Sequence, residues 1–319
     1  MTLVPVETPE DFLLAQQFII PHEETCVTLA SLVRRKTDKL VFLVDSDNPM
    51  VECSRSECIE TTADIDKPVV SIRPSAYSTN IVGILNLDST IYHCLPDISK
   101  IDKESLKENL PYLMKKPVRC ISGETTATEF LIDVVNSINC SFNPSASPAQ
   151  QPVVIYPYRM LRWLSSFDTS TSLSTLSGGE EIFRCTENDM EILHPLQKDY
   201  MKDEVAVPGR TITDAEVSIT LRQILKNQLC LAMLCDGEPV AKANTNAIGI
   251  NCVQIGGVYT HPLYRGNGYA GALVQALCNR AIQGKRKPVL FVKEKNTPAF
   301  NLYQKLGFEE CGRYTIAYY

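Results

Sequence analysis

Apolar runs of strand length alternate with helix-like segments along the chain. Apolar positions at helical spacing predict helices, and short β-branched or apolar runs predict strands. The first half predicts helices at 8–20, 23–35, 103–115 and 126–138, with strands at 40–44, 69–72, 81–87, 90–95, 118–122 and 153–156.

The second half predicts the same kinds of element in a similar order. Helices are expected at 186–204, 214–227, 270–280 and 297–306, with strands at 182–185, 229–235, 240–247, 252–260, 288–293 and 314–319. The two halves share their order of elements without a repeat of individual residues. Internal duplication is therefore a hypothesis that the sequence raises and does not decide.

Two stretches of small polar residues and proline interrupt the pattern. Residues 139–152 predict an exposed loop. Residues 165–179 are rich in Ser and Thr, and we take them as the boundary between an N-terminal domain at 1–178 and a C-terminal domain at 179–319. The alternative is one long hairpin loop within a single domain.

Composition excludes several classes of protein. The net charge of −6 argues against nucleic acid as a partner, because nucleic-acid-binding proteins usually carry a basic face. No apolar run approaches the roughly 20 residues of a membrane helix, so no membrane partner is expected. The first residues lack the basic segment and apolar core of a signal peptide. We therefore expect a cytoplasmic protein.

Twelve cysteines are scattered along the chain and form no C-x-x-C pair. We interpret them as reduced, buried thiols, in keeping with a cytoplasmic protein. Cys53 and Cys58 lack the second pair of ligands that a structural zinc site needs, so no metal is expected.

The strongest chemical signal lies at 254–273. A β-branched strand runs into His261 and Pro262, a glycine-containing turn follows at 265–270, and a helix begins near Ala270. The start of a helix leaves backbone N–H groups unpaired and carries a partial positive charge. This arrangement predicts a site for a phosphate or pyrophosphate group.

One interpretation of the glycines is a dinucleotide site. Gly266, Gly268 and Gly271 fit the pattern G-x-G-x-x-G. In a dinucleotide-binding domain, however, the first glycine follows the first strand closely. Here 261–265 intervene, several strands come earlier, and only 272–319 follow, which disfavours this interpretation.

The second interpretation is the pattern R-x-x-G-x-A, which Arg265, Gly268 and Ala270 satisfy. A second motif, N-x-x-A-x-x-L-Y-x-K-L-G-F, occupies 296–308. With both motifs in this order, residues 181–319 resemble the GNAT family of acetyl-CoA-dependent N-acetyltransferases. The chain also resembles the lineage in which a GNAT-like N-terminal domain precedes the active one.

The resemblance implies an α/β (α+β) fold with a mixed, mostly antiparallel sheet flanked by helices, in two tandem GNAT-like domains. It also implies transfer of acetyl from acetyl-CoA to a primary amine by direct attack, with no covalent enzyme intermediate. The first half has no counterpart of 265–268, so we expect it to lack the coenzyme A site. The acceptor is expected to be a small-molecule or peptide amine.

Roles for individual residues follow from the resemblance. The strand at 257–260 is expected to separate from that at 291–293, with the Val258 amide polarising the thioester carbonyl. Tyr303 would protonate the departing thiolate. The residues expected to bind coenzyme A are Val258, Tyr259, Thr260, Arg265, Gly266, Asn267, Gly268, Tyr269, Ala270 and Asn296.

The general base is less well defined by the sequence. Glu204 is the favoured candidate, because it lies in the region that faces the acceptor in this family. The alternatives are Glu216, Glu238, His194 and Tyr259.

Three polar residues, Lys242, Asn244 and Asn246, share one face of a strand. They either line the acceptor cleft or form a solvated face. The N-terminal half is open to three roles: covering the cleft, forming a homodimer or binding a partner. An acyl-CoA sensor without transferase activity is the alternative function.

Overall fold

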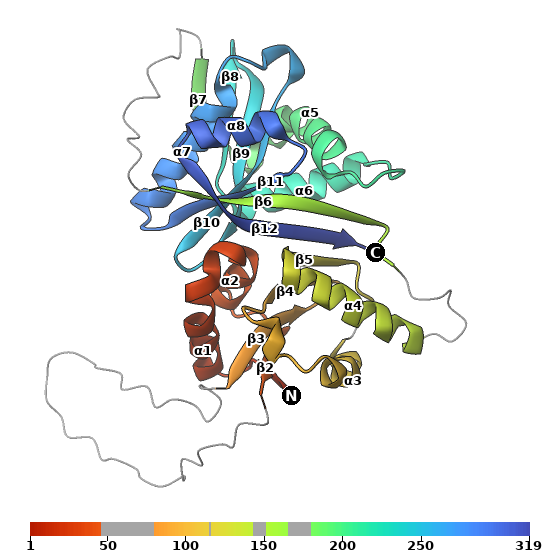
Figure 1. The fold of residues 1–319 in the computed structure, drawn as a ribbon. Coiled ribbons are helices and arrows are strands. Elements are labelled where there is room, and N and C mark those ends of the chain that lie inside the picture. The colour runs from red at the N-terminus through yellow and green to blue at the C-terminus, as the bar shows by residue number, and fades with distance from the viewer. Residues whose placement is uncertain (46–79, 115, 143–150, 165–179) are drawn as a thin grey trace, which may run out of the picture.

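The computed structural model describes residues 1–45, 80–114, 116–142, 151–164 and 180–319. Its strands form one sheet of twelve, in the order β1-β2-β3-β4-β5-β12-β6-β11-β10-β9-β8-β7. Most neighbouring strands are antiparallel, and the pairs β4–β5 and β10–β11 are parallel. Figure 1 shows the two halves of the chain one above the other, with β6 and β12 crossing between them.

The N-terminal half has the element order βααβββαβαβ. Its elements are β1 (Thr2–Pro5), α1 (Pro9–Ile19), α2 (Val27–Arg34), β2 (Leu40–Val44), β3 (Ile81–Leu87), β4 (Thr90–Cys94), α3 (Lys103–Leu113), β5 (Cys120–Glu124), α4 (Thr125–Phe142) and β6 (Val154–Trp163).

The C-terminal half has the same order. Its elements are β7 (Glu180–Arg184), α5 (Met190–Tyr200), α6 (Asp214–Asn227), β8 (Cys230–Cys235), β9 (Glu238–Ile248), β10 (Cys252–Thr260), α7 (Tyr269–Gln283), β11 (Lys287–Lys293), α8 (Thr297–Lys305) and β12 (Phe308–Tyr318).

The arrangement of the strands repeats as well. The strand order can be read backwards from β7, with each strand replaced by its counterpart in the other half (β7 by β1, β8 by β2 and so on, and the reverse). The same order then results. Each half gives its last strand to the other: β6 lies between β11 and β12, and β12 lies between β5 and β6. The fold is thus two units of the same topology that share their central strands, as the hypothesis of internal duplication requires.

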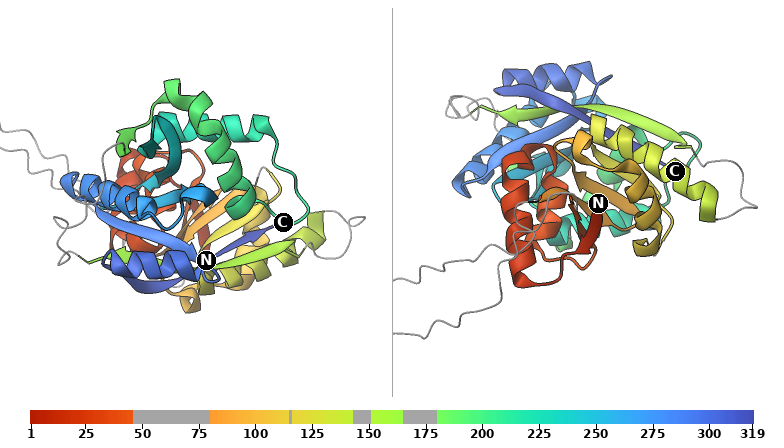
Figure 2. Two further views of the ribbon diagram at one scale, coloured as in Figure 1. Left: turned by 90° about the horizontal axis from the view of Figure 1, so that it is seen from above. Right: turned by 60° about the horizontal axis from the view of Figure 1, so that its bottom comes forward.

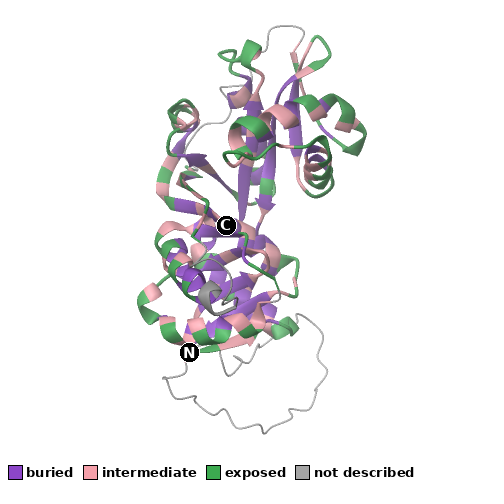
Figure 3. Ribbon diagram, turned by 90° about the vertical axis from the view of Figure 1, so that its right-hand side faces the viewer, coloured by how far each residue is buried: buried purple, intermediate pink, exposed green. Residues whose placement is uncertain are grey.

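Helices cover both faces of the sheet because neighbouring strand residues point to opposite sides. In β2, Leu40 and Phe42 pack with α1 and α2, whereas Val41 and Leu43 pack with α3 and α4. Figure 2 shows these two helix pairs on either side of the N-terminal strands. The same alternation in β8 directs some residues toward α5 and α6 and others toward α7. Figure 3 shows the resulting buried layer along the strands.

Most of the predicted elements are present, with differences at their ends. The predicted helix at 23–35 is a 3-10 segment at Ile20–Thr25 followed by α2, and α4 extends into the predicted loop at 139–152. The predicted strand at 69–72, the loop residues 143–150 and the proposed domain boundary at 165–179 lie outside the described residues. The boundary itself stays a prediction.

The two shared strands are much longer than their patterns predict. β6 has ten residues and β12 has eleven. Charged side chains interrupt the apolar alternation of both strands, so the sequence pattern predicted only a short part of each. Arg162 faces Glu309 in the register of the pair and lies 2.7 Å from it, whereas Arg159, which faces Arg313, lies 2.9 Å from Glu310. Opposite charges at facing strand positions stabilise a pair that the sequence of either strand alone does not reveal.

A carboxylate of the N-terminal half binds the β9–β10 turn. Glu23 is 2% exposed, and its carboxylate accepts hydrogen bonds from the backbone N–H groups of Ile250 at 2.6 Å, Asn251 at 2.9 Å and Cys252 at 3.0 Å. Since backbone N–H groups away from water need partners, this side chain joins the two halves and gives three N–H groups of the turn an acceptor.

Among the described residues, no helix has the length and apolar character needed to cross a bilayer.

Candidate functional site

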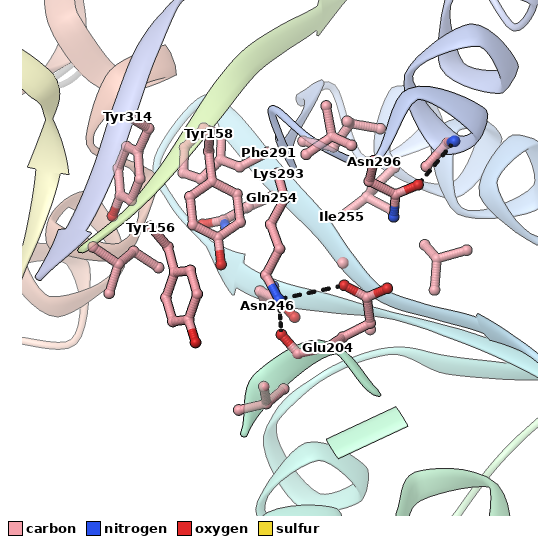
Figure 4. A pocket seen from close by; sticks show the side chains of 18 of the residues that line it. Tyr156, Tyr158, Glu204, Asn246, Gln254, Ile255, Phe291, Lys293, Asn296 and Tyr314 are labelled. Atoms are coloured by element: carbon pink, nitrogen blue, oxygen red, sulfur yellow. Dashed lines mark hydrogen bonds and ion pairs between the residues drawn. The ribbon is translucent and has the colours of Figure 1, made fainter. Parts of the chain in front are cut away.

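The candidate site lies where β10 and β11 separate. Their parallel ladder runs from the pair Cys252–Lys287 to the pair Ile255–Leu290 and then ends. Beyond it, 256–260 and 291–293 diverge, as the resemblance implies. A cavity of about 340 Å³ occupies this opening, and Figure 4 shows the side chains around it.

A bulge in β10 shapes one wall of the cavity. Gly256 pairs with Asn244 and Tyr259 pairs with Lys242, so β10 has one residue more than β9 between these pairs. Gly257 has φ of +58°, and a Cβ there would lie 2.0 Å from the Asn244 side-chain oxygen. Bulges redirect backbone groups out of the ladder. This one places Gly257 and Val258 on the cavity wall.

The predicted phosphate loop follows the end of β10 at which β10 and β11 separate. Gly266 and Gly268 have φ of +88° and +81°, and Gly268 is the N-cap of α7. No side chain caps this helix, so the amides of its first turn stay available to an anion. The loop is held internally, since Arg265 Nε donates to the Thr260 carbonyl at 3.1 Å and Asn267 Nδ2 donates to the Tyr264 carbonyl at 3.1 Å.

Two of the predicted coenzyme A residues have side chains engaged elsewhere. The Tyr259 hydroxyl donates to Asp203 at 2.8 Å, and the Tyr269 hydroxyl donates to Glu180 at 2.5 Å. Both residues are buried. Any contact that they make with a cofactor would therefore come from their backbone, as for Ala270 in the first turn of α7.

The corresponding loop of the N-terminal half cannot serve as a phosphate site. The chain between β4 and α3 contains no glycine, and the Asp102 carboxylate caps α3 by accepting from the N–H groups of Glu104 and Ser105. The helix start is thus already occupied by a negative charge, which repels a phosphate. That the first half lacks a coenzyme A site stays a prediction.

Asn296 and Tyr303 both line the cavity from the side of α8. Asn296 is the N-cap of α8, and its side-chain oxygen accepts from the Ala299 N–H at 3.2 Å (Figure 4). Tyr303 is 7% exposed, and burial is the main cause that raises the pKa of its phenol well above the ordinary value, with Tyr200 and Glu204 adding to it. The phenol therefore keeps its proton at neutral pH.

Glu204 is the only one of the five candidate bases whose residue lines the cavity. It lies in a π-helical turn at Met201–Val205, a conformation that often marks functional sites. Its carboxylate lies 3.5 Å from Lys293 Nζ, which also donates to the Glu204 carbonyl (Figure 4).

The other candidates lie elsewhere or are engaged. Glu216 belongs to the cap of α6, with its carboxylate bonded to Thr213. His194 Nε2 lies 3.4 Å from the carbonyl oxygen of Asp214, within hydrogen-bond distance. Glu238 is exposed at the start of β9. The fourth, Tyr259, is the residue bonded to Asp203.

The polar face of β9 is mostly buried and does not form a solvated surface. Lys242 and Asn244 are 0% and 1% exposed, and Asn246 lines the cavity. A solvated sheet face is therefore wrong for Lys242 and Asn244, and neither of them lines the cavity, whereas Asn246 is exposed and lines it.

The cavity also has a wall that the sequence did not predict. Tyr156 and Tyr158 of β6 and Tyr314 of β12 line it, and Phe291 stacks on Tyr314 with ring centroids 4.2 Å apart (Figure 4). The N-terminal half adds one residue each from α2, β4 and β5. The sequence signal that could have indicated this wall is the recurrence of tyrosine along β6 and β12. The residues of this wall include Thr28, Tyr92, Ser122, Tyr156, Tyr158, Tyr314, Ile316 and Tyr318.

Comparison with known proteins supports the assignment of the fold. A Drosophila protein of known structure is 13% identical over 99% of this chain and 98% of its own, with a TM-score of 0.58. A GNAT-family acetyltransferase from Colwellia psychrerythraea is 11% identical over 100% of both chains, with a TM-score of 0.52. At these identities the likeness establishes the fold and no more.

Shorter likenesses also occur. A predicted acetyltransferase from Clostridium acetobutylicum, solved with acetyl-CoA, is 23% identical over 41% of this chain and 91% of its own, with a TM-score of 0.35. No curated protein matches the chain. The model of the acetyltransferase (GNAT) family matches residues 193–308, from α5 to the first residue of β12. The chain therefore carries a GNAT-family acetyltransferase domain at residues 193–308.

Proposed function

We propose that this protein transfers the acetyl group of acetyl-CoA to a primary amine by direct attack. The observation that carries the proposal is that three features follow one another at the end of β10. These are the separation of β10 from β11, the bulge at Gly257 and the uncapped start of α7 behind Gly268. A pantetheine arm fits beside the bulge, and the helix start suits a pyrophosphate.

The chemistry needs one bond to form and one to break. The amine nitrogen attacks the thioester carbon, and the carbonyl oxygen becomes an oxyanion that accepts a hydrogen bond from the Val258 N–H. The C–S bond then breaks, and the thiolate takes the proton of the Tyr303 phenol. The proton lost by the amine passes to Glu204, directly or through water. An oxyanion donor typically contributes about 10²–10³ in rate, and a general acid about 10²–10⁴.

The cavity favours a small acceptor. Its volume of about 340 Å³ is at the lower end of the range for small-molecule sites. One residue each from α2, β4 and β5 also lines the cavity. The N-terminal half thus covers the acceptor site, which supports a small-molecule amine over a peptide.

Replacing Gly268 with Glu should weaken the binding of acetyl-CoA strongly. A side chain at φ of +81° is strained, and a carboxylate at the start of α7 repels the pyrophosphate. Isothermal titration calorimetry should show a Kd at least about 100-fold higher than in the wild type.

Gly237→Glu is the matched control. Gly237 has φ of +85°, open space around its Cα like Gly268, and a position in the β8–β9 turn, outside the loop at 265–270. The control should bind acetyl-CoA as the wild type does. Equal affinities for Gly268→Glu and the wild type, or no binding by the wild type, would overturn the proposed function.

A further inference from the structure

Lys242 is an ammonium group buried without a carboxylate partner. It is 0% exposed, and within the described part of the chain no acidic side chain lies within 4.0 Å of its Nζ. Burial is the main cause that lowers its pKa. An isolated buried charge is costly to keep, so its position calls for an explanation.

The surroundings of Lys242 are built for a cation. Nζ donates to the Gly257 carbonyl at 2.9 Å and to the Asn244 side-chain oxygen at 3.2 Å, and it lies 4.7 Å from the centre of the Tyr200 ring. All three groups offer negative charge density, which an ammonium with three donors can use. These contacts favour the charged form and oppose the effect of burial.

The geometry of a peptide group connects Lys242 to the cavity. The Gly257 carbonyl and the Val258 N–H belong to one planar, trans peptide, so they point in opposite directions. With Lys242 on the oxygen, the N–H lies on the opposite side of this peptide. Gly257 and Val258 line the cavity, whereas Lys242 does not.

We propose that Lys242 is a positioning residue whose ammonium holds the Gly257–Val258 peptide and polarises the Val258 N–H toward the thioester carbonyl. A charge-assisted hydrogen bond to a carbonyl draws electrons across the amide and makes its N–H a stronger donor. The gain is largest when the oxyanion has formed, so Lys242 stabilises the transition state more than the bound substrate. This inference rests on the proposed function.

A role limited to holding the bulge would have other consequences. If Lys242 only fixed the backbone, its loss would let the bulge relax and would weaken the binding of the pantetheine arm. The Kd of acetyl-CoA and kcat would then change together. Polarisation instead lowers kcat while binding is nearly unchanged, because the donor matters most in the transition state.

The test combines Lys242→Met with Lys242→Arg, which keeps the charge. Lys242→Met should lower kcat about 10- to 100-fold and change the Kd of acetyl-CoA by less than about threefold. Lys242→Arg should recover most of the lost kcat. The proposal is overturned if Lys242→Met keeps its kcat within threefold, or if its Kd rises by the same factor as kcat falls.

A spectroscopic measurement separates this proposal from the proposed function. In the free protein, the Val258 amide proton should move upfield in the NMR spectrum of Lys242→Met, because a less polarised N–H is less deshielded. The amide proton of Gly237, in the β8–β9 turn and outside the β10 bulge, should stay in place and report that the fold is intact. An unmoved Val258 resonance contradicts polarisation, even if the wild type proves to have no transferase activity.

Discussion

Tyr303→Phe should lower kcat by about 10² to 10⁴ while the Kd of acetyl-CoA stays within a few-fold of the wild type. The substitution removes one hydroxyl from a side chain that is 7% exposed and lines the cavity, so little packing is lost. Without the phenol, the thiolate leaves without a proton donor. Steady-state kinetics with an accepted amine, together with calorimetric binding, would measure the two quantities separately.

The same change at Tyr112, which is 88% exposed on α3, is the control and should leave kcat unchanged. Equal kcat values for Tyr303→Phe and the wild type would exclude the phenol as the proton donor. If both proteins bind acetyl-CoA and neither acetylates any amine, the alternative of an acyl-CoA sensor gains support.

The raised pKa of Tyr303 also predicts the shape of the pH profile. Burial favours the neutral phenol, so the proton is retained above the ordinary tyrosine pKa of about 10. Loss of this proton should therefore not reduce kcat between pH 7 and about 10. Any fall of kcat toward acid pH would come from protonation of the amine or of its base. A profile of kcat against pH, compared with that of Tyr303→Phe, checks this.

Glu23→Gln should lower the free energy of unfolding by about 1–3 kcal/mol, the usual cost of leaving buried hydrogen-bond donors without their partner. The carboxylate accepts from three consecutive N–H groups of the β9–β10 turn, and an amide presents its own N–H groups to some of these donors. Chemical denaturation would measure the loss, and the thermal midpoint should fall by several degrees.

The neighbouring Glu24 provides a sharp control. Its carboxylate lies 3.5 Å from Arg162 and 3.5 Å from Lys287, in partly exposed ion pairs that contribute little in water. Glu24→Gln should therefore cost less than about 1 kcal/mol. Similar losses for the two variants would mean that the Glu23 contacts with the turn contribute no more than surface ion pairs.

Local patterns predicted most elements, because periodicity and caps act within a few residues. The helix at 214–227 was predicted with the bounds it has, and in the structure Thr213 and Glu216 form a capping box at its start. The loop behind Arg265 and the helix with Tyr303 were recognised for the same reason. Their motifs are continuous in the chain, and the structure brings Val258, Asn296 and Tyr303 to one cavity.

Contacts between distant segments could not be predicted in this way. Nothing near Tyr156 indicates that β6 lies between two strands of the other half, since its partners are more than 120 residues away. The contact of Glu23 with Cys252 likewise depends on how the halves meet, and the burial of Lys242 depends on contacts with Gly257 and Tyr200, which lie 15 and 42 residues away. The composition of the acceptor wall therefore had to come from the structure.

The position of β12 has a consequence for the order in which the chain can fold during synthesis. It leaves the ribosome after every other described strand, yet it lies in the middle of the sheet between β5 and β6. Until then β5 has an unpaired side, and β6 lacks one of its two neighbours. The N-terminal unit, although made first, can complete its sheet only when the C-terminal unit is almost finished, and both are then completed together.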